Sequence, residues 1–171
     1  MKDRKLLARA YDRSADSYDD RFRALQRPKY EAALPFLPEV AATCLDAGGG
    51  TGLFQEFLRE RGHPLAGARW LVLDLSLGML REGDGLRCAA DLSHLPLRPG
   101  SFDLAVAFTS ILDEPGRQLR EIQATLVADG LLVASFLAAE ADAALAHPSG
   151  LRQIAKAAPA GQDVLLVFRK D

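Results

Sequence analysis

The chain has 171 residues, of which 49% are hydrophobic, and its formal net charge is −2 at pH 7. This length is enough for one domain with a substantial core and too short for two ordinary domains. The near-neutral charge gives no reason to expect nucleic acid or an anionic membrane as the main partner. The longest uncharged apolar run, residues 131–139, is less than half of the roughly 20 residues that a membrane-spanning helix requires.

The N-terminal stretch "MKDRKLLARAYDRSADSYDD" is interrupted by charge too often to form the apolar region of a signal peptide. The sequence therefore predicts a cytoplasmic protein. Both cysteines, Cys44 and Cys88, fall in apolar segments of strand type, which favours buried free thiols over a disulfide. The spacing of cysteines and histidines matches no metal site, so no metal is expected.

Along the chain, apolar runs of strand length alternate with segments of helical period, which is typical of an α/β domain built on a mostly parallel sheet. The predicted strands cover residues 42–47, 70–75, 86–90, 104–108, 131–136 and 163–169. The predicted helices cover residues 2–24, 29–34, 52–61, 77–81, 117–127, 138–146 and 151–157. The central runs "WLVLDL" and "LLVASFL" are apolar without alternation, as expected for strands that helices cover on both faces.

The segment "TCLDAGGGTGLFQEFL", residues 43–58, runs from an apolar strand through an acidic residue and four glycines into an amphipathic helix. Ligands of such sheets bind outside the carboxyl ends of the strands, where the strand order reverses. A dinucleotide-binding G-x-G-x-x-G pattern would need glycine where this chain has Leu53. A phosphate-binding P-loop would need lysine after its last glycine, and none is present. The spacing therefore disfavours NAD and nucleoside triphosphates.

The remaining pattern, Asp46-x-Gly48-x-Gly50-x-Gly52, resembles the first motif of class I S-adenosylmethionine (SAM)-dependent methyltransferases. Glycine lets the backbone turn sharply and approach a ligand, and the following helix presents free N–H groups. The resemblance implies that Asp46, Gly48, Gly49, Gly50 and Gly52 hold the methionine end of SAM. A carboxylate beside the glycines suits a sulfonium ligand better than a pyrophosphate, because like charges would repel each other.

Further segments resemble the same family at predicted strand ends. "WLVLDLSLGML" is similar to the family passage whose aspartate accepts hydrogen bonds from both ribose hydroxyls, and "CAADLSHLPL" is similar to the passage that holds the adenine. "LPLRPGSFDLAVA" resembles the passage that leads into the fourth strand. The resemblance implies cofactor contacts by Asp74, Leu75, Met79, Asp91 and Leu92. Taken singly, each of these aspartates is better explained as a helix cap or turn residue.

The N-terminal stretch "AYDRSADSYDDRF" resembles members of the ubiquinone- and menaquinone-biosynthesis type, the methyltransferase type 11 group. In those relatives this segment folds over the cofactor, which makes Tyr18 a candidate pocket residue. Tyr11 and Tyr18 are seven positions apart and so share one helical face. Two aromatic residues that pack a helix onto the sheet would give the same pattern, and for Tyr11 this second interpretation is preferred.

Methyl transfer from a sulfonium depends on aligning the acceptor and excluding water, and it needs no covalent nucleophile. After the predicted fourth strand, the chain reads "FTSILDEPGRQ". Phe108 is therefore a candidate cofactor contact, Thr109 and Ser110 could line the acceptor side, and Asp113 is a candidate base. The run "DEP" is equally typical of a helix start. The Asn/Asp-Pro-Pro-Tyr motif for planar amines is missing, which disfavours methylation of an amino base. The expected acceptor is an O, C or N atom of an unidentified small molecule, with a macromolecule as the alternative.

The resemblance implies an α/β, Rossmann-like doubly wound sheet, mostly parallel with an antiparallel last strand, of six or seven strands, with N-terminal helices over the cofactor site. We expect a single domain over residues 1–171: a helical cap (1–40), a cofactor-binding core (41–137) and a shortened C-terminal part (138–171). The last part has one convincing strand, "DVLLVFRK", so the sixth strand is either hidden in the Ala-rich segment or absent. The acceptor site would then be open, or completed by a second copy or a protein partner.

The expected protein is thus a SAM-dependent methyltransferase (EC 2.1.1.-) with a small-molecule acceptor and without a nucleic-acid or membrane partner. Two alternatives stay open. A methyltransferase-like binding subunit without independent activity would explain the short C-terminal part. An NAD-dependent reductase would require glycine at position 53.

Overall fold

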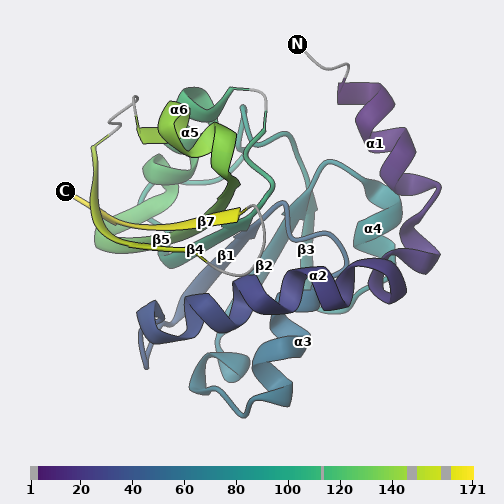
Figure 1. Ribbon diagram of the computed structural model, residues 1–171, viewed down its shortest axis with the longest axis horizontal. Helices are drawn as coiled ribbons and strands as arrows, with labels where there is room; N and C mark the ends of the chain where they lie inside the picture. Colours follow the sequence, from purple (N-terminus) through teal and green to yellow (C-terminus); the bar gives the residue numbers. More distant parts are fainter. Residues whose placement is uncertain (1–3, 113, 146–149, 159–162) are drawn as a thin grey trace.

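A seven-stranded sheet forms the centre of the computed structural model, which describes residues 4–112, 114–145, 150–158 and 163–171 (Figure 1). The strand order is β3-β2-β1-β4-β5-β7-β6. Neighbouring strands from β3 to β5 are parallel, whereas β7 runs antiparallel to both β5 and β6. The strands are β1 (Thr43–Ala47), β2 (Arg69–Asp74), β3 (Leu86–Ala89), β4 (Phe102–Phe108), β5 (Leu126–Leu137), β6 (Leu151–Ala157) and β7 (Asp163–Lys170). The predicted fold class, including the antiparallel last strand, is confirmed.

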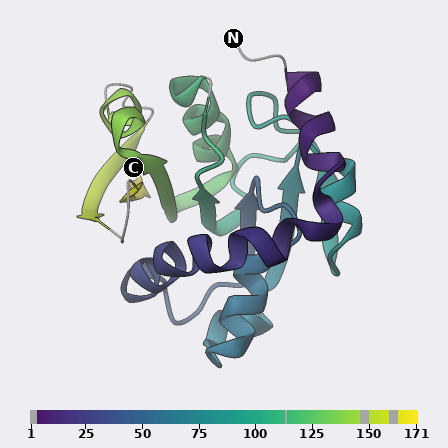
Figure 2. The same ribbon diagram turned by 45° about the vertical axis from the view of Figure 1, so that its right-hand side comes forward.

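Helices cover both faces of this sheet (Figures 1 and 2). They are α1 (Arg4–Asp12), α2 (Tyr18–Ala33), α3 (Leu53–Glu60), α4 (Leu77–Arg81), α5 (Pro115–Thr125) and α6 (Ala138–Leu145). Three 3₁₀ turns join them to their neighbours: η1 (Ala15–Ser17), η2 (Leu34–Phe36) and η3 (Pro64–Gly67). A search of the described residues finds no helix with the length and apolar character needed to span a membrane.

The core consists of two apolar clusters, one on each face of the sheet. Strand β4 shows the division, because Leu104 and Val106 pack with α2 and α3, whereas Ala105 and Ala107 pack with α5 and α6. Successive side chains of a strand point to opposite faces, so a strand buried on both faces reads as a continuous apolar run. This burial explains why the central strands lack the alternation of a half-exposed sheet.

Residues 151–157 form strand β6, so the predicted helix over this range is wrong, and the sixth strand that the sequence left open is present. The stretch "LRQIAKA" is rich in good helix formers, and local propensity therefore favours a helix. Pairing with β7 satisfies the backbone groups of this segment instead. Because β6 lies at the sheet edge, polar residues such as Arg152 and Lys156 remain exposed to solvent.

The N-terminal helices also differ from the prediction, which had one helix over residues 2–24 and another over 29–34. The first helix ends at Asp12, and α2 then runs through Pro28 without a break. Asp12 instead binds the start of α4, where its Oδ1 accepts hydrogen bonds from Ser76 Oγ (2.5 Å) and the Gly78 N–H (2.8 Å). Figure 2 shows the resulting arrangement, with α1 running beside α4. Strand β5 likewise starts at Leu126, within the range predicted as helix.

Candidate active site

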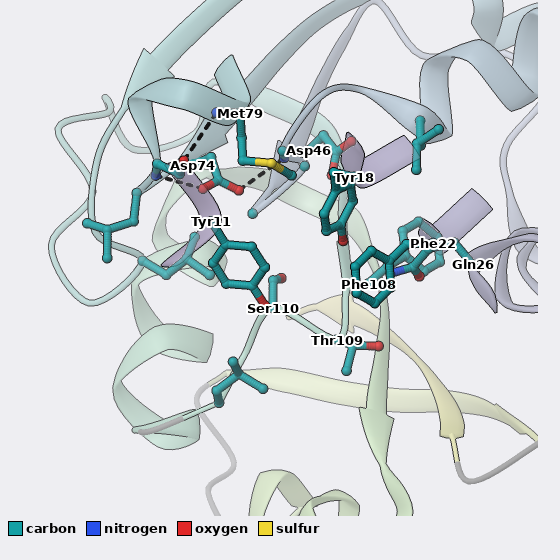
Figure 3. Close-up of a pocket in the computed structure, with 18 of the residues that line it drawn as sticks. Tyr11, Tyr18, Phe22, Gln26, Asp46, Asp74, Met79, Phe108, Thr109 and Ser110 are labelled. Carbon is teal, nitrogen blue, oxygen red and sulfur yellow. Dashed lines mark hydrogen bonds between the residues drawn. The ribbon is translucent and has the colours of Figure 1, made fainter. Parts of the chain in front are cut away.

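A cavity of about 320 Å³ lies at the carboxyl ends of β1, β2 and β4, beneath the N-terminal helices (Figure 3). This is the position expected for ligands of a doubly wound sheet. Its lining includes most of the residues that the sequence singled out for a cofactor: Tyr18, Asp46, Gly48, Gly49, Gly50, Asp74, Leu75, Met79, Asp91, Leu92 and Phe108. Segments far apart in the sequence therefore meet in one hollow.

The glycine loop after β1 is held in place by hydrogen bonds from both sides. The Gly50 N–H donates to Asp74 Oδ2 (3.0 Å), and the Arg87 guanidinium donates to the carbonyl oxygens of Gly50 (3.0 Å) and Thr51 (2.9 Å). Burial lowers the pKa of Arg87, and its two carbonyl partners belong to the glycine loop. The loop is therefore preorganised before any ligand binds.

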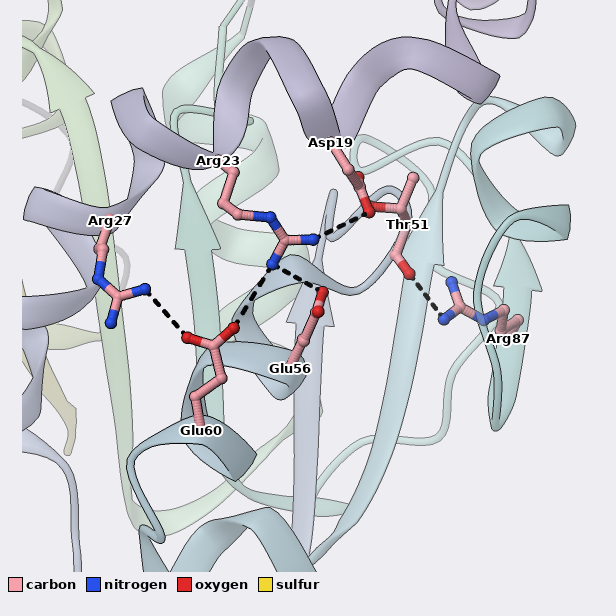
Figure 4. Close-up of polar contacts among 7 residues, drawn as sticks. All are labelled: Asp19, Arg23, Arg27, Thr51, Glu56, Glu60 and Arg87. Atoms are coloured by element: carbon pink, nitrogen blue, oxygen red, sulfur yellow. Dashed lines mark hydrogen bonds and ion pairs between the residues drawn. The ribbon is translucent and has the colours of Figure 1, made fainter.

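A second set of polar contacts joins α2 to the same loop and to α3 (Figure 4). Thr51 Oγ1 donates to Asp19 Oδ1 (2.6 Å), and Arg23 lies 3.0 Å from Glu56 and 3.7 Å from Glu60. The side chains of Arg23, Glu56 and Glu60 are about 40% exposed, so each of these ion pairs contributes little to stability. Their geometry nevertheless sets the position of α2 above the cavity.

Gly52 does not line the cavity, although the sequence grouped it with the cofactor glycines. It is the N-cap of α3 and has φ of +94°, a left-handed conformation that residues with a Cβ rarely adopt. A Cβ at this position would also lie 2.9 Å from Arg87 Nη2. The sharp turn into the helix thus explains why this position is a glycine.

Two carboxylates at the ends of β1 and β2, the buried Asp46 and the partly buried Asp74, line the cavity. Asp46 is 2% exposed, and burial raises its pKa to about 7, although it accepts a hydrogen bond from Gln55 Nε2 (2.9 Å). Burial also raises the pKa of Asp74, against the opposing effect of hydrogen bonds from the backbone N–H groups of Ser76 and Gly50. The Asp74 charge adds to the rise in the pKa of Asp46, and the Asp12 charge adds to the rise in the pKa of Asp74. The site therefore favours a ligand that brings positive charge.

The third carboxylate, Asp91, lines the cavity beyond β3 and also forms a turn, because the Ser93 N–H donates to Asp91 Oδ1 (2.8 Å). The turn interpretation and the cavity interpretation therefore both apply to this residue. Leu92 follows it and is 8% exposed, which leaves an apolar surface beside the carboxylate. A carboxylate next to an apolar wall suits a flat ring that carries an amino group.

Aromatic side chains from α1 and α2 roof the cavity (Figure 3). Tyr18 stacks on Phe22, with 4.6 Å between ring centroids, and contacts the edge of Tyr11 at 6.2 Å. Burial raises the pKa of Tyr18 to about 12, so its hydroxyl keeps its proton. Tyr11, for which a packing role was preferred, also lies in the cavity lining, with its ring at the edge of Tyr18.

The second helix supplies cavity residues that the sequence analysis did not identify. They share one face of α2 and are Phe22, Leu25, Gln26, Lys29 and Tyr30. Their spacing of three and four residues is the signal that would have revealed this face. It was missed because the predicted helix ended at residue 24, before Pro28.

The candidate acceptor residues Thr109 and Ser110 lie in the cavity lining beside Phe108. Thr109 has φ of +54°, which is unusual for a β-branched residue, and Ser110 Oγ donates to the Ala47 carbonyl oxygen (2.6 Å). The turn after β4 therefore brings two hydroxyls to the cavity. Asp113, the candidate base, lies outside the described residues.

Comparison with known proteins places this geometry in a family. The model of a family described as a methyltransferase domain matches residues 45–134, more than half of the chain. The chain belongs to this methyltransferase family. Its members use SAM as the cofactor, and the resemblance to class I SAM-dependent methyltransferases that the sequence indicated is thereby confirmed.

Similar curated proteins carry a more specific name. The chain is 38% identical over 111 residues to a malonyl-[acyl-carrier protein] O-methyltransferase of Pseudescherichia vulneris, covering 61% of this chain and 42% of that protein. It is 34% identical over 144 residues to the protein of that name in Geobacter sulfurreducens, covering 77% of this chain and 52% of the relative. The chain thus spans about half the length of the curated relatives it matches.

A solved structure shows the same fold at low identity. It is a Burkholderia thailandensis 1,6-didemethyltoxoflavin-N1-methyltransferase with bound 1,6-didemethyltoxoflavin and S-adenosylhomocysteine. Its TM-score is 0.71 at 20% identity, and the match covers 97% of this chain and 88% of that one. The likeness extends the methyltransferase architecture through the C-terminal strands of this chain.

The cavity of this methyltransferase is chemically suited to SAM. The glycine loop has no side chains between its backbone and the cavity, and Gly49 packs so closely on Asp46 that an added Cβ would lie 2.3 Å from the carboxylate carbon. The buried carboxylates favour the ammonium and sulfonium groups of SAM over a phosphate. The residues that are present therefore fit the family cofactor.

The tight packing at Gly49 makes it a specific test of the loop. We expect Gly49→Ala to displace the Asp46 carboxylate, because the new methyl group is fixed to the backbone and would overlap the carboxylate carbon. SAM binding should weaken by about tenfold or more in calorimetry. Gly67→Ala is the matched control, since a Cβ at Gly67 meets nothing within 4 Å. Equal SAM affinity in the two variants would contradict the assignment of this loop to the cofactor.

Proposed function

We propose that this domain transfers the methyl group of SAM to the free carboxylate of a malonyl thioester carried on an acyl carrier protein. The observation that carries the proposal is the single cavity, in which three carboxylates at the ends of β1, β2 and β3 adjoin an acceptor side lined by hydroxyls. The names of the similar curated proteins support this choice of acceptor. The acceptor is then a small acyl group attached to a protein, which joins the small-molecule and macromolecular acceptors that the sequence left open.

In this proposal, each carboxylate has a separate part of the cofactor to hold. Asp74 accepts hydrogen bonds from the ribose hydroxyls, Asp91 from the adenine amino group, and Asp46 with the glycine loop holds the amino-acid end. SAM supplies a methyl group on a sulfonium, which is an activated leaving group. We further propose that the helical cap over residues 1–40 excludes water, because Tyr11 and Tyr18 roof the cavity.

A carboxylate acceptor also explains how the site can work without a dedicated base. The carboxylate of a malonyl group is ionised at neutral pH, so its oxygen is already a nucleophile and no proton has to be removed. What the protein must supply is alignment with the methyl group and removal of water. The candidate base Asp113 then has no necessary role in the reaction.

The test is methyl transfer from labelled SAM to malonyl-carrier protein and, separately, to a malonyl thioester of N-acetylcysteamine. We expect label in a base-labile methyl ester on the malonyl thioester and none on the matching acetyl thioester, which has no free carboxylate. Protein that binds SAM yet labels neither malonyl substrate would contradict the proposed acceptor. Transfer that begins only when a second chain is added would favour the partner-dependent subunit instead.

A further inference from the structure

A buried ammonium group lies on the acceptor side of the cavity. Lys29 of α2 lines the cavity and is 8% exposed, and it is the only lysine or arginine among the lining residues in the described part of the chain. Its Nζ lies 2.8 Å from Thr109 Oγ1 and 2.9 Å from Asp163 Oδ2. A buried charge is costly unless it is paired and hydrogen-bonded, and these two partners meet that condition for the Lys29 ammonium.

Sheet topology brings these groups together from distant parts of the sequence. Because β7 runs antiparallel to β5, its first residue, Asp163, lies opposite Leu137 at the edge where the parallel strands end. Thr109 follows β4 at the same edge, and its Oγ1 lies 3.1 Å from Ser135 Oγ of β5. Lys29 reaches this edge from the α2 helix above it. The cluster therefore exists only because the C-terminal strands complete the sheet.

The ammonium has a hydrogen-bonding position to spare. It carries three N–H donors, of which Thr109 and Asp163 take two in the described structure. The third N–H is thus available to an acceptor oxygen of a ligand in the cavity, such as that of a carboxylate.

We propose that the Lys29 ammonium, oriented by Thr109 and Asp163, binds the carboxylate of the acceptor through the oxygen that is not methylated. This inference rests on the proposed function and names the residue that selects its substrate class. The cofactor end of the cavity carries three carboxylates, which repel an anionic acceptor, so a fixed cation is needed to bring one close. Asp163 keeps the ammonium in place from outside the cavity lining.

Calorimetry on protein saturated with S-adenosylhomocysteine tests this role without relying on turnover. The ligands are the malonyl thioester of N-acetylcysteamine, its acetyl counterpart, and the simple carboxylates malonate, succinate and acetate. We expect Lys29→Met to weaken malonyl thioester binding by about tenfold or more, because a charge-assisted hydrogen bond is lost. We expect the affinity for SAM to change by less than about twofold, since the cofactor carboxylates are untouched.

The matched control is Asp163→Asn, which removes the same ion pair but keeps the ammonium and an oxygen that can accept from it. We expect this variant to retain malonyl thioester binding. Equal losses in Lys29→Met and Asp163→Asn would show that the pair only supports the fold, and unchanged binding in Lys29→Met would equally overturn the proposal. Should Lys29→Met fail to fold, the double variant Lys29→Met/Asp163→Asn replaces it, because it leaves neither charge of the ion pair buried alone. Its malonyl thioester affinity is then compared with that of Asp163→Asn.

The ligand panel separates this inference from the proposed function. Binding of another carboxylate but not of the malonyl thioester, lost in Lys29→Met, would reject the malonyl acceptor and support Lys29. Absence of binding by every carboxylate of the panel to the unmodified protein would overturn the role of Lys29. Methyl transfer to the malonyl thioester that survives Lys29→Met with an unchanged KM would support the proposed function and overturn this inference alone.

Discussion

Asp74→Ala is expected to weaken SAM binding by roughly 100-fold, which corresponds to the loss of two charge-assisted hydrogen bonds of about 1.5 kcal/mol each. The side chain stands at the end of β2, where its two oxygens already accept from the N–H groups of Gly50 and Ser76. These backbone bonds orient the carboxylate, and the remaining lone pairs are left for a ligand. The variant loses both the ligand contact and the support of the glycine loop.

Asp74→Asn separates these two effects. Asparagine keeps one oxygen for the Gly50 N–H but replaces the other with a donor, so we expect an intermediate loss of SAM affinity of about tenfold. Calorimetry with SAM and S-adenosylhomocysteine measures both variants, and the unfolding midpoint reports the change at the loop. SAM affinity that stays within threefold in Asp74→Ala would refute the assignment of the ribose to this residue.

The pH dependence of SAM binding is expected to follow Asp46. Burial raises the pKa of this carboxyl to about 7, so in the ligand-free protein it is largely neutral below that pH and ionised above it. The positive groups of SAM favour the ionised form. We therefore expect affinity to level off above about pH 8 and to fall by up to about tenfold for each pH unit below 7, measured by calorimetry from about pH 6 to about pH 8.5.

Asp46→Asn is the control for this prediction. It is expected to bind SAM weakly at every pH and to remove most of the dependence between about pH 6 and 8. The free energy of unfolding of the ligand-free protein should instead rise as the pH falls. Because the pKa of Asp46 is raised on folding, its contribution to the free energy of unfolding is complete below about pH 4 and is lost as the pH rises through about 7. An identical pH profile of SAM affinity in Asp46→Asn and the unmodified protein would contradict this account.

The cofactor side of the cavity was largely predictable from sequence, because its determinants are local. Asp46, Gly48 and Gly50 follow one strand within a few positions, and Asp74 ends the next strand, so motif spacing alone predicts their meeting at one sheet edge. Gly52 shows the limit of this reasoning. Spacing groups it with its neighbours, but the direction of the backbone at φ +94° places it in the turn behind the cavity.

The roof and the acceptor side depended on contacts that no local pattern encodes. The end of α1 at Asp12 is tied to the start of α4, and Tyr11, the residue before it, lines the cavity. The helical face of α2 was readable in principle, but the prediction divided this segment at residues 25–28, whereas α2 runs through Pro28 and packs Tyr30 against the core. Helix boundaries of this kind are decided by the surface against which the helix packs.

What the sequence by itself determined is the family, the order of strands and helices from β1 through β5, and the strand-end carboxylates that suit a cationic nucleoside. The tertiary structure alone decided that residues 151–157 pair as an edge strand, and that Asp163 thereby stands beside Lys29 and Thr109. The physical reason is that helix propensity and motif spacing act between neighbours in the chain. Strand pairing and the burial of a charge depend on which distant partner lies across the sheet.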